Sequence, residues 1–389
     1  MNKHILNTAV QDFIESYSED ISKLAFTGSP FTNVSVQELI QQIEGRQKVE
    51  KKLPNWFHSR GVYYPPKLHL EQTSSEVTAK YKASLVEGDK MADLTGGFGV
   101  DAYYFSEVFN SVQYFERNQS LSEIAAHNFE RLSKNNIQCL AVDGIETGLQ
   151  QHYDVLYVDP SRRHDSKGKV FYLKDCEPNI PDHLRDLLDH CTTLMIKTSP
   201  MLDITIGMQE LNTVAQLHIV AVNNEVKELL WLVQKDYKGT THIHTVNITN
   251  SGTEIFSLER GYMASVTYAP PQCFLYEPNS AIMKSGAFDL VSEEFSIHKL
   301  HKHSHLYTSD TLYEFPGRRF TIEKIIPYTK ASIRKELTIS KANITIRNFP
   351  ESVAKLRKKW GIKEGGDDYL FFTTLENEQK VIIRCSRVQ

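Results

Sequence analysis

Four acidic residues stand where successive strand-like segments of the sequence end: Asp93, Glu116, Asp143 and Asp159. In an open α/β sheet, the carboxyl ends of the strands form the crevice that receives a ligand. Carboxylates at these ends can accept hydrogen bonds from the hydroxyl and amino groups of one bound molecule. One acidic strand end is commonplace, but four in succession, beginning at a glycine-rich turn, indicate a site for a polar ligand.

The glycine-rich turn follows the first of these strands, in the segment MADLTGGFGVD at residues 91–101. Gly96, Gly97 and Gly99 allow the backbone to turn sharply and a ligand to approach it closely. A strand, a tight glycine turn and a helix N-terminus together form half of a nucleotide-binding site. The spacing is not the GxGxxG of dinucleotide-binding proteins, and no Gly-Lys-Ser/Thr follows as a phosphate-binding P-loop requires.

The side chains around this turn have distinct tasks available. Glu116, about 20 residues beyond the turn, can accept hydrogen bonds from both hydroxyl groups of a ribose. Asp143 can accept one from an adenine amino group. Asp93 and the backbone of residues 96–99 can hold the amino-acid end of a cofactor. We therefore expect these residues to bind a cofactor: Asp93, Thr95, Gly96, Gly97, Gly99, Glu116 and Asp143.

The order of these motifs over residues 90–200 resembles class I S-adenosylmethionine-dependent methyltransferases. Amino-group methyltransferases carry Asp/Asn-Pro-Pro-aromatic at the fourth motif, where the first side chain orients the target NH2 toward the cofactor methyl group. Here the motif reads Asp159–Pro160–Ser161–Arg162, so the second proline and the aromatic residue are replaced. The resemblance implies that Asp159, Pro160 and Arg162 are catalytic.

Arg162 stands where that motif has its base-stacking aromatic residue. Its guanidinium can stack on a base or hold a phosphate, Phe171 or Tyr172 can supply the stack instead, or Arg162 forms only ion pairs. Residues 154–174 also look like the loop of bacterial guanine-N2 methyltransferases acting on small-subunit ribosomal RNA. That resemblance implies RNA contacts by the basic residues of the loop, Arg163, Lys167 and Lys169.

The elements that position these residues follow from the apolar pattern. Residues 1–70 predict helices, because apolar residues recur at helical spacing. From Lys90 onward, short apolar strands alternate with helices, which indicates a parallel sheet covered on both faces. The segments LLWLVQ and HIHTVNIT read as adjacent strands without a helix between them, so we expect the sheet to end antiparallel.

The whole chain resembles a more specific family: bacterial class I methyltransferase-like proteins with a ferredoxin-like insert and a C-terminal THUMP-like domain. The matching stretches include EQTSSEVTAKYK, DLTGGFGVDA, DPSRR, KTSPMLD, NNEVKELLW, YEPNSAIMKSGAF, FPGRRF, IRNFP and GGDDYLFFTT. The resemblance implies an α/β protein with a Rossmann-like methyltransferase domain and small C-terminal α+β domains. Its expected parts are a helical domain (1–70), the methyltransferase domain (71–250), a ferredoxin-like domain (272–320) and a THUMP-like, RNA-binding domain (321–389).

Charge is distributed unevenly along the chain. Residues 318–363 hold 13 Lys and Arg against three acidic residues, a net charge of +10, so the remaining residues carry −14 of the total of −4. This asymmetry suggests a polyanion-binding module attached to an acidic catalytic body, although a solvated basic face is the alternative. Within the module we expect RNA contacts by Arg347, Lys355, Arg357, Lys358 and Lys359.

Several classes of protein are disfavoured by composition. The five cysteines are scattered without a CxxC, which favours reduced thiols in the cytoplasm. Asp12 and Glu15 interrupt the first apolar run, so it is no signal peptide, and no apolar run approaches the roughly 18–20 residues that span a bilayer. The HxxHxHxH spacing of residues 298–305 fits no standard metal site. We expect no metal and no membrane association.

The sequence thus predicts an enzyme that uses S-adenosylmethionine to methylate tRNA or rRNA, at a guanine exocyclic amine. Two alternatives remain open: a non-catalytic RNA-binding protein that retains a methyltransferase fold, and a methyltransferase for a small molecule or protein. The second alternative leaves the basic segment unexplained.

Overall fold

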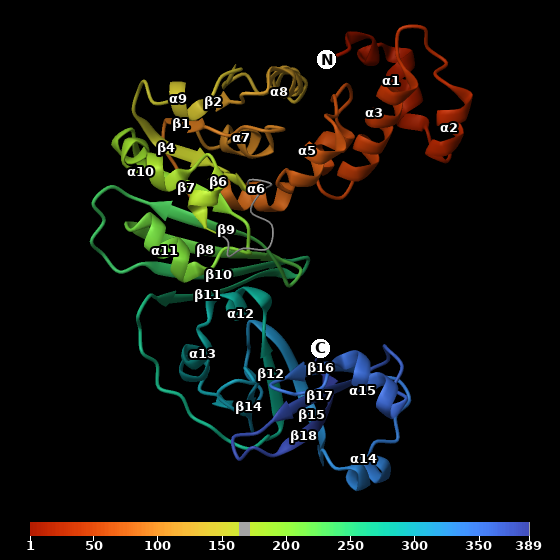
Figure 1. Ribbon diagram of the computed structural model, residues 1–389, viewed down its shortest axis with the longest axis vertical. Helices are drawn as coiled ribbons and strands as arrows, with labels where there is room; N and C mark the ends of the chain where they lie inside the picture. The colour runs from red at the N-terminus through yellow and green to blue at the C-terminus, as the bar shows by residue number, and fades with distance from the viewer. Residues whose placement is uncertain (163–171, 389) are drawn as a thin grey trace. The chain divides into compact units, whose positions relative to one another are not determined.

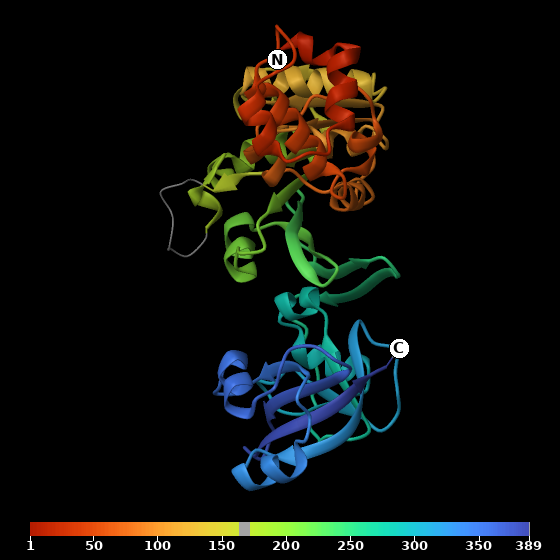
Figure 2. The same ribbon diagram turned by 90° about the vertical axis from the view of Figure 1, so that its right-hand side faces the viewer.

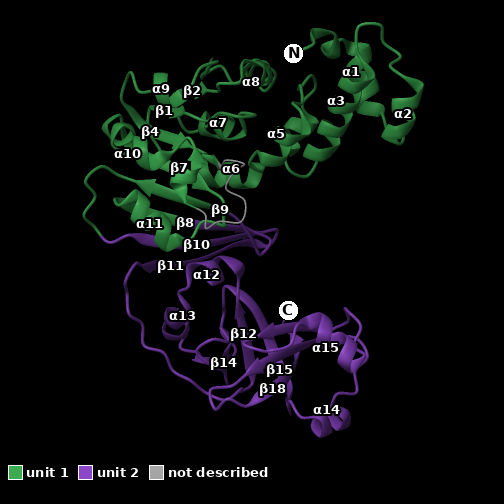
Figure 3. Cartoon of the chain, in the orientation of Figure 1, with its two compact units in different colours: residues 1–217, 228–239 green, residues 218–227, 240–389 purple. Residues whose placement is uncertain are grey.

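The computed structural model describes residues 1–162 and 172–388, in two compact units (Figures 1 and 3). The first unit contains residues 1–217 and 228–239, and the second contains residues 218–227 and 240–389. The side chain of Arg162 lies outside the described part, as do residues 163–171 and 389.

The chain begins with a group of helices, coloured red to orange in Figures 1 and 2. Ser35 and Glu38 form a capping box at the start of the longest one, and Pro54 occupies the first turn of another. Leu39 and Trp56 are buried where these helices pack together. The elements are η1 (Lys3–Leu6), α1 (Thr8–Ser16), α2 (Ile21–Thr27), α3 (Val36–Val49), α4 (Pro54–His58), α5 (Lys67–Gln72) and α6 (Glu76–Ala83).

A nine-stranded sheet follows, in the order β11-β10-β8-β9-β7-β4-β1-β2-β3. Strands β3, β2, β1, β4 and β7 are parallel, and β9 runs antiparallel to β7. The strands are β1 (Lys90–Asp93), β2 (Ser111–Phe115), β3 (Ile137–Leu140), β4 (Tyr153–Val158), β7 (Cys191–Thr198), β8 (Val214–Val222), β9 (Glu225–Val233), β10 (His242–Thr249) and β11 (Gly252–Glu259). The expected α/β class is confirmed.

The antiparallel end of the sheet differs from the expectation in one respect. The segments LLWLVQ and HIHTVNIT fall in β9 and β10, and β8 lies between these two strands. Asn223 and Asn224 both have positive φ, as a two-residue hairpin turn requires, and they join β8 directly to β9. The hairpin places β8 where the sequence reading expected β10.

Helices connect the parallel strands: α7 (Val100–Phe105), α8 (Gln119–Arg131), α9 (Gly144–Thr147), α10 (Ile180–Asp189) and α11 (Ile204–Leu211). Helix α7 ends at Phe105, because the Glu107 and Val108 amides bond to carbonyls three residues back. Helix α9 has only four residues, so a single helical turn joins β3 to β4 on that side of the sheet.

The second unit contains a seven-stranded sheet in the order β13-β14-β12-β15-β18-β17-β16. Its elements are β12 (Phe274–Pro278), α12 (Ser280–Ser285), α13 (Phe288–Glu294), β13 (His298–Lys299), β14 (Tyr307–Ser309), β15 (Gly317–Pro327), α14 (Lys330–Glu336), β16 (Asn343–Arg347), α15 (Val353–Trp360), β17 (Asp368–Thr374) and β18 (Lys380–Arg387). Gly286 adopts the left-handed conformation and separates α12 from α13. Helices α14 and α15 bury Ile333 and Leu356 in one apolar cluster with Phe372 and Ile382 of the sheet.

Two expected domain limits fall inside regular elements. The limit at residues 70 and 71 lies within α5, and the limit at residues 320 and 321 lies within β15. Strand β15 pairs with β12 on one side and with β18 on the other. Residues 321–389 therefore share one continuous sheet with residues 272–320.

Candidate active site

The glycine turn connects the end of β1 to the start of α7 and is tied to both neighbouring strands. The Leu94 amide donates to the Tyr157 carbonyl at 3.0 Å, and the Gly96 amide donates to the Phe115 carbonyl at 2.8 Å. A Cβ on Gly96 would lie 2.1 Å from the Tyr114 ring. Close packing of the turn against β2 therefore requires glycine at this position.

Asp93 is the last residue of β1 and is 1% exposed. Its Oδ1 accepts a hydrogen bond from the Thr95 amide at 3.0 Å. Burial, followed by the nearby charge of Asp101, raises the pKa of the Asp93 carboxyl well above its ordinary value. The side chain lies beneath the turn and fixes its backbone, so its expected contact with a cofactor stays a prediction.

Glu116 immediately follows β2 and lies against the same turn. Its Oε2 accepts a hydrogen bond from the Gly97 amide at 2.9 Å, and its Oε1 accepts one from the Asn118 amide at 2.7 Å. Each carboxylate oxygen has a second lone pair, so Glu116 can still accept from the two hydroxyl groups of a ribose. The structure thus brings Glu116 and the glycine turn together.

Asp143 caps the N-terminus of α9. Its Oδ1 accepts hydrogen bonds from the Ile145 amide at 2.9 Å and the Glu146 amide at 3.2 Å. Gly144 approaches the turn closely, because a Cβ there would lie 2.5 Å from the Leu94 carbonyl oxygen. The cap thus fixes Asp143 beside the glycine turn, where its Oδ2 can accept from an amino group.

Asp159 directly follows β4 and is anchored in two ways. Its backbone amide donates to Thr95 Oγ1 at 2.7 Å, and its Oδ2 forms an ion pair with the Lys197 ammonium. Burial alone would lower the pKa of Lys197, but the carboxylates of Asp159 and Glu228 outweigh it and raise that pKa above its usual range. Asp159 and the glycine turn therefore meet at Thr95.

Sequence reasoning missed Lys197. The residue lies in the KTSPMLD stretch that carries part of the family resemblance, one position before the end of β7. The available signal was a basic side chain near the end of β7, the strand beside the one that leads into the Asp-Pro motif. Strand order was needed to read that signal, because β4 and β7 are neighbours in the sheet.

A network of buried ionic side chains lies in the first unit, as the site does. Lys82 is fully buried, and its Nζ lies 2.9 Å from both carboxylate oxygens of Glu228 and 3.2 Å from Asp101 Oδ1. The Tyr157 hydroxyl donates to Asp101 Oδ2 at 2.9 Å. Burial, opposed by Lys82, raises the pKa of Glu228. The network joins α6, α7, β4 and β9, and α7 begins directly after the glycine turn.

The remainder of the Asp-Pro segment is described only in part. Ser161 and Arg162 form the short strand β5, which pairs with β6 (Cys176–Glu177). The side chain of Arg162 lies outside the described residues, so its expected role beside Asp159 and Pro160 stays a prediction. Four further positions of this loop also lie outside them: Arg163, Lys167, Lys169 and Phe171.

The basic residues of segment 318–363 that were expected to contact RNA differ from one another in their surroundings. Arg347 donates to Glu277 Oε1 at 2.8 Å, and Arg357 donates to the carbonyls of Ala342 and Ile362 at 3.2 and 3.4 Å. These two guanidinium groups thus hold parts of the fold together.

Three lysines of α15 are more accessible. Lys359 is bound to Glu351 and lies over the Tyr328 ring. Lys355 and Lys358 are exposed, with only a 3.8 Å contact from Lys355 to Glu351 recorded among the described residues. Lys355 and Lys358 are therefore the members of the expected set best placed to meet a polyanion.

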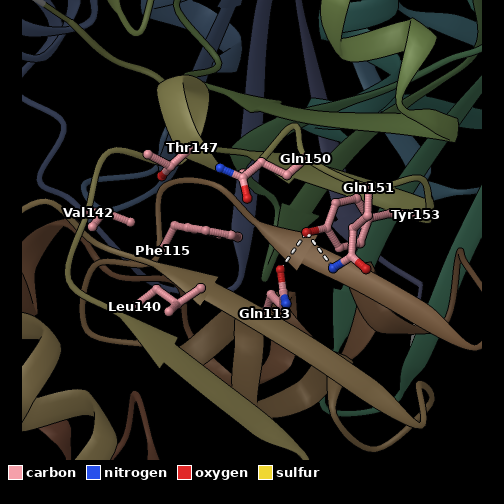
Figure 4. Close-up of a pocket in the computed structure, with 9 residues that line it drawn as sticks. Gln113, Phe115, Leu140, Val142, Thr147, Gln150, Gln151 and Tyr153 are labelled. Atoms are coloured by element: carbon pink, nitrogen blue, oxygen red, sulfur yellow. Dashed lines mark hydrogen bonds between the residues drawn. The ribbon is translucent and has the colours of Figure 1, made fainter.

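A pocket of about 410 Å³ opens on the β2, β3 and β4 strands near the single turn of α9 (Figure 4). Gln151 donates to the Tyr153 hydroxyl at 3.1 Å, and that hydroxyl bonds to Gln113. Phe115 and Val142, also in the lining, directly precede Glu116 and Asp143. The lining carries no carboxylate, ammonium, guanidinium or imidazole group, so it offers neutral contacts beside the acidic crevice.

No helix in residues 1–162 or 172–388 is long and apolar enough to cross a membrane. Within the same ranges, no group of three or more His, Cys, Asp or Glu side chains is arranged to hold a metal ion.

Comparison with known proteins places this architecture among class I methyltransferase folds with two added modules. A family model described as a ferredoxin-like domain matches residues 274–316, and a THUMP domain-like model matches residues 317–387. A crystal structure from Porphyromonas gingivalis W83, provisionally described as a methyltransferase, has 31% identity and a TM-score of 0.89, covering 100% of this chain and 99% of that one. The chain belongs to the same family as this Porphyromonas protein.

Other similar structures match only part of the chain. An rRNA methylase from Streptococcus thermophilus has 12% identity and a TM-score of 0.30, covering 42% of this chain and 98% of its own. TrmK of M. capricolum, solved with S-adenosyl-homocysteine, has 12% identity and a TM-score of 0.33, covering 41% of this chain and 68% of its own. Comparison with curated proteins gave no significant match.

Proposed function

We propose that this protein transfers a methyl group from S-adenosylmethionine to tRNA or rRNA, at a guanine exocyclic amine. The observation that carries the proposal is the convergence of three strand ends on one glycine turn. Glu116 bonds to the amide of Gly97, and the Asp159 amide bonds to Thr95. Acceptors for a nucleoside and an acceptor for a target amine thus adjoin the same turn.

The residues around the turn fit S-adenosylmethionine. A Cβ built on Gly97 would meet no atom closer than 3.8 Å, so this part of the turn leaves room for a ligand. Glu116 would hold the ribose hydroxyls, and Asp143 would hold the adenine amino group. Thr95 and the backbone of residues 96–99 would hold the amino-acid end. S-adenosylmethionine supplies an activated methyl group on a sulfonium, so little acid–base catalysis is required of the protein.

Asp159 would act on the acceptor. Its carboxylate is 31% exposed and can accept a hydrogen bond from the target NH2, which orients the nitrogen lone pair. Orientation of this kind is a large source of rate enhancement when two reactants are held together. The exposed cations of the C-terminal module would hold RNA phosphates, and the THUMP-like match supports a nucleic-acid partner.

Two measurements test this function. Calorimetry with S-adenosylhomocysteine should detect binding of roughly micromolar affinity, which corresponds to a favourable binding free energy on the order of 8 kcal/mol. Tritium from methyl-labelled S-adenosylmethionine should then enter total RNA from a strain that lacks the gene. Cofactor binding without label in RNA, but with label in protein or small molecules, would favour the non-RNA alternative. RNA binding without cofactor binding would favour a non-catalytic RNA-binding protein.

A further inference from the structure

Lys197 occupies a defined position opposite the Asp-Pro motif. Strands β4 and β7 are parallel, and Val158 pairs with Ile196. Asp159 and Lys197 directly follow this pair in the sequence, and both lie at the carboxyl edge of the sheet. The Lys197 side chain is only 15% exposed, so its ammonium is fixed inside the protein.

The Asp159 carboxylate has one recorded contact among the described residues, the ion pair from Lys197 to Oδ2. Its backbone is held separately, by the hydrogen bond to Thr95 Oγ1 at 2.7 Å. Lys197 therefore orients the carboxyl group about a fixed backbone. Among the described residues Oδ1 has no hydrogen-bond donor, so both of its lone pairs can accept from another molecule.

Lys197 lies near three acidic side chains. Against the effect of burial, the carboxylates of Asp159, Glu228 and Asp101 all act on the Lys197 ammonium and raise its pKa. The Lys82 ammonium is bound to Glu228 and Asp101. Without Lys197, the Asp159 carboxylate would lose the ion pair that limits its rotation.

We propose that Lys197 is a positioning residue for methyl transfer, which holds one oxygen of Asp159 so that the other accepts from the target amine. This inference rests on the function proposed above. It assigns Lys197 no contact with the reacting atoms, because the residue acts through Asp159. The ion pair limits the rotation of the carboxylate before RNA arrives.

The test compares full-length Lys197→Met, Lys197→Arg, Asp159→Asn and the double variant Lys197→Met/Asp159→Asn. Lys235→Met is the matched control, because Lys235 forms an exposed ion pair with Asp189. Calorimetry with S-adenosylhomocysteine measures the cofactor site, and tritium transfer to total RNA from a strain lacking the gene gives kcat and KM. The double variant removes both charges of the Lys197–Asp159 pair. It therefore replaces Lys197→Met in the test if that single variant does not fold.

Lys197→Met should lower kcat by about 10- to 100-fold, the scale of a misplaced reacting group, while cofactor affinity and the KM for RNA stay within twofold of wild type. Lys197→Arg should restore part of the loss. In the Asp159→Asn background, adding Lys197→Met should change kcat by less than about twofold, because coupled residues are not additive. Lys235→Met should behave as wild type.

Two results would overturn the inference while leaving the proposed function standing. In the first, Lys197→Met methylates RNA as fast as an active wild type. In the second, its effect is fully additive with that of Asp159→Asn. A wild-type protein that binds no S-adenosylhomocysteine, or that labels no RNA, overturns the proposed function itself and the inference with it.

Discussion

The carboxylate of Glu116 and the backbone amide of Gly97 are joined by a hydrogen bond of 2.9 Å. The contact links the end of β2 to the glycine turn that follows β1. It gives Glu116 two tasks in the proposed mechanism, since the same carboxylate that would accept from a ribose also holds the turn in place. Loss of the side chain should therefore affect cofactor binding directly and through the turn.

Glu116→Ala should weaken binding of S-adenosylhomocysteine by about 1–3 kcal/mol, because charge-assisted hydrogen bonds are lost. Calorimetry on wild type and variant measures the difference. Glu123→Ala, which removes a half-exposed glutamate from α8, is the control and should bind as wild type does. Equal affinities for wild type and Glu116→Ala would show that this carboxylate does not bind the nucleoside.

The buried ion pair between Lys82 and Glu228 should matter for stability. Lys82→Met leaves Glu228 unpaired in the interior and should reduce the free energy of unfolding by about 3–5 kcal/mol. Lys82→Met/Glu228→Gln should recover part of that loss. Denaturant unfolding compares them with Lys235→Met, whose exposed pair should cost about 1 kcal/mol or less. A Lys82→Met protein as stable as this control would argue against a structural network.

His218 should make the protein sensitive to acid. Burial, and then the charge of His244, lowers the pKa of His218 to about 3. Its native pKa lies below its unfolded value of about 6.5, so its contribution to stability is complete above that pH and is lost as pH falls toward 3.

Between pH 7.5 and 4.5, His218→Phe should therefore lose about 2–3 kcal/mol less stability than wild type does. Urea unfolding at the two pH values measures the difference. His152→Phe, at an exposed histidine, serves as control. Identical losses in wild type and His218→Phe would mean that His218 accepts a proton in the folded state.

The basic module is better tested by charge than by truncation, because removing residues 321–389 would cut through β15. Lys355→Glu/Lys358→Glu should weaken binding to RNA and reduce the salt dependence of that binding by about one to two units. Filter binding at several salt concentrations measures both. Lys3→Glu/Lys51→Glu makes the same change of net charge at exposed N-terminal positions and should bind normally. Equal effects from the two pairs would indicate a general charge effect without a binding face.

The sequence alone was sufficient for the glycine turn and the strand-end acids, because these features are local. Partners distant in sequence could not be found in this way. Lys197 is 38 residues from Asp159, and Lys82 is 146 residues from Glu228. Each pair is brought together only by the order of strands and helices in the fold.

The C-terminal cations illustrate the same limit. Composition identified Arg347 as a basic residue but not its partner Glu277, which is 70 residues away on another strand. Apolar patterning also does not locate the end of α12, where the left-handed backbone of Gly286 ends the helix.

The central claim, that Asp159 orients an amine of RNA for methylation, is tested most directly by mass spectrometry of RNA nucleosides. A strain lacking the gene is complemented with wild type or with Asp159→Ala, and S-adenosylhomocysteine affinity is measured on both purified proteins. The account predicts an N2-methylguanosine that wild type restores and Asp159→Ala does not, with in vitro turnover reduced by about 100-fold or more and cofactor affinity within about 1 kcal/mol. A variant that restores the modified nucleoside at the wild-type rate would contradict the account.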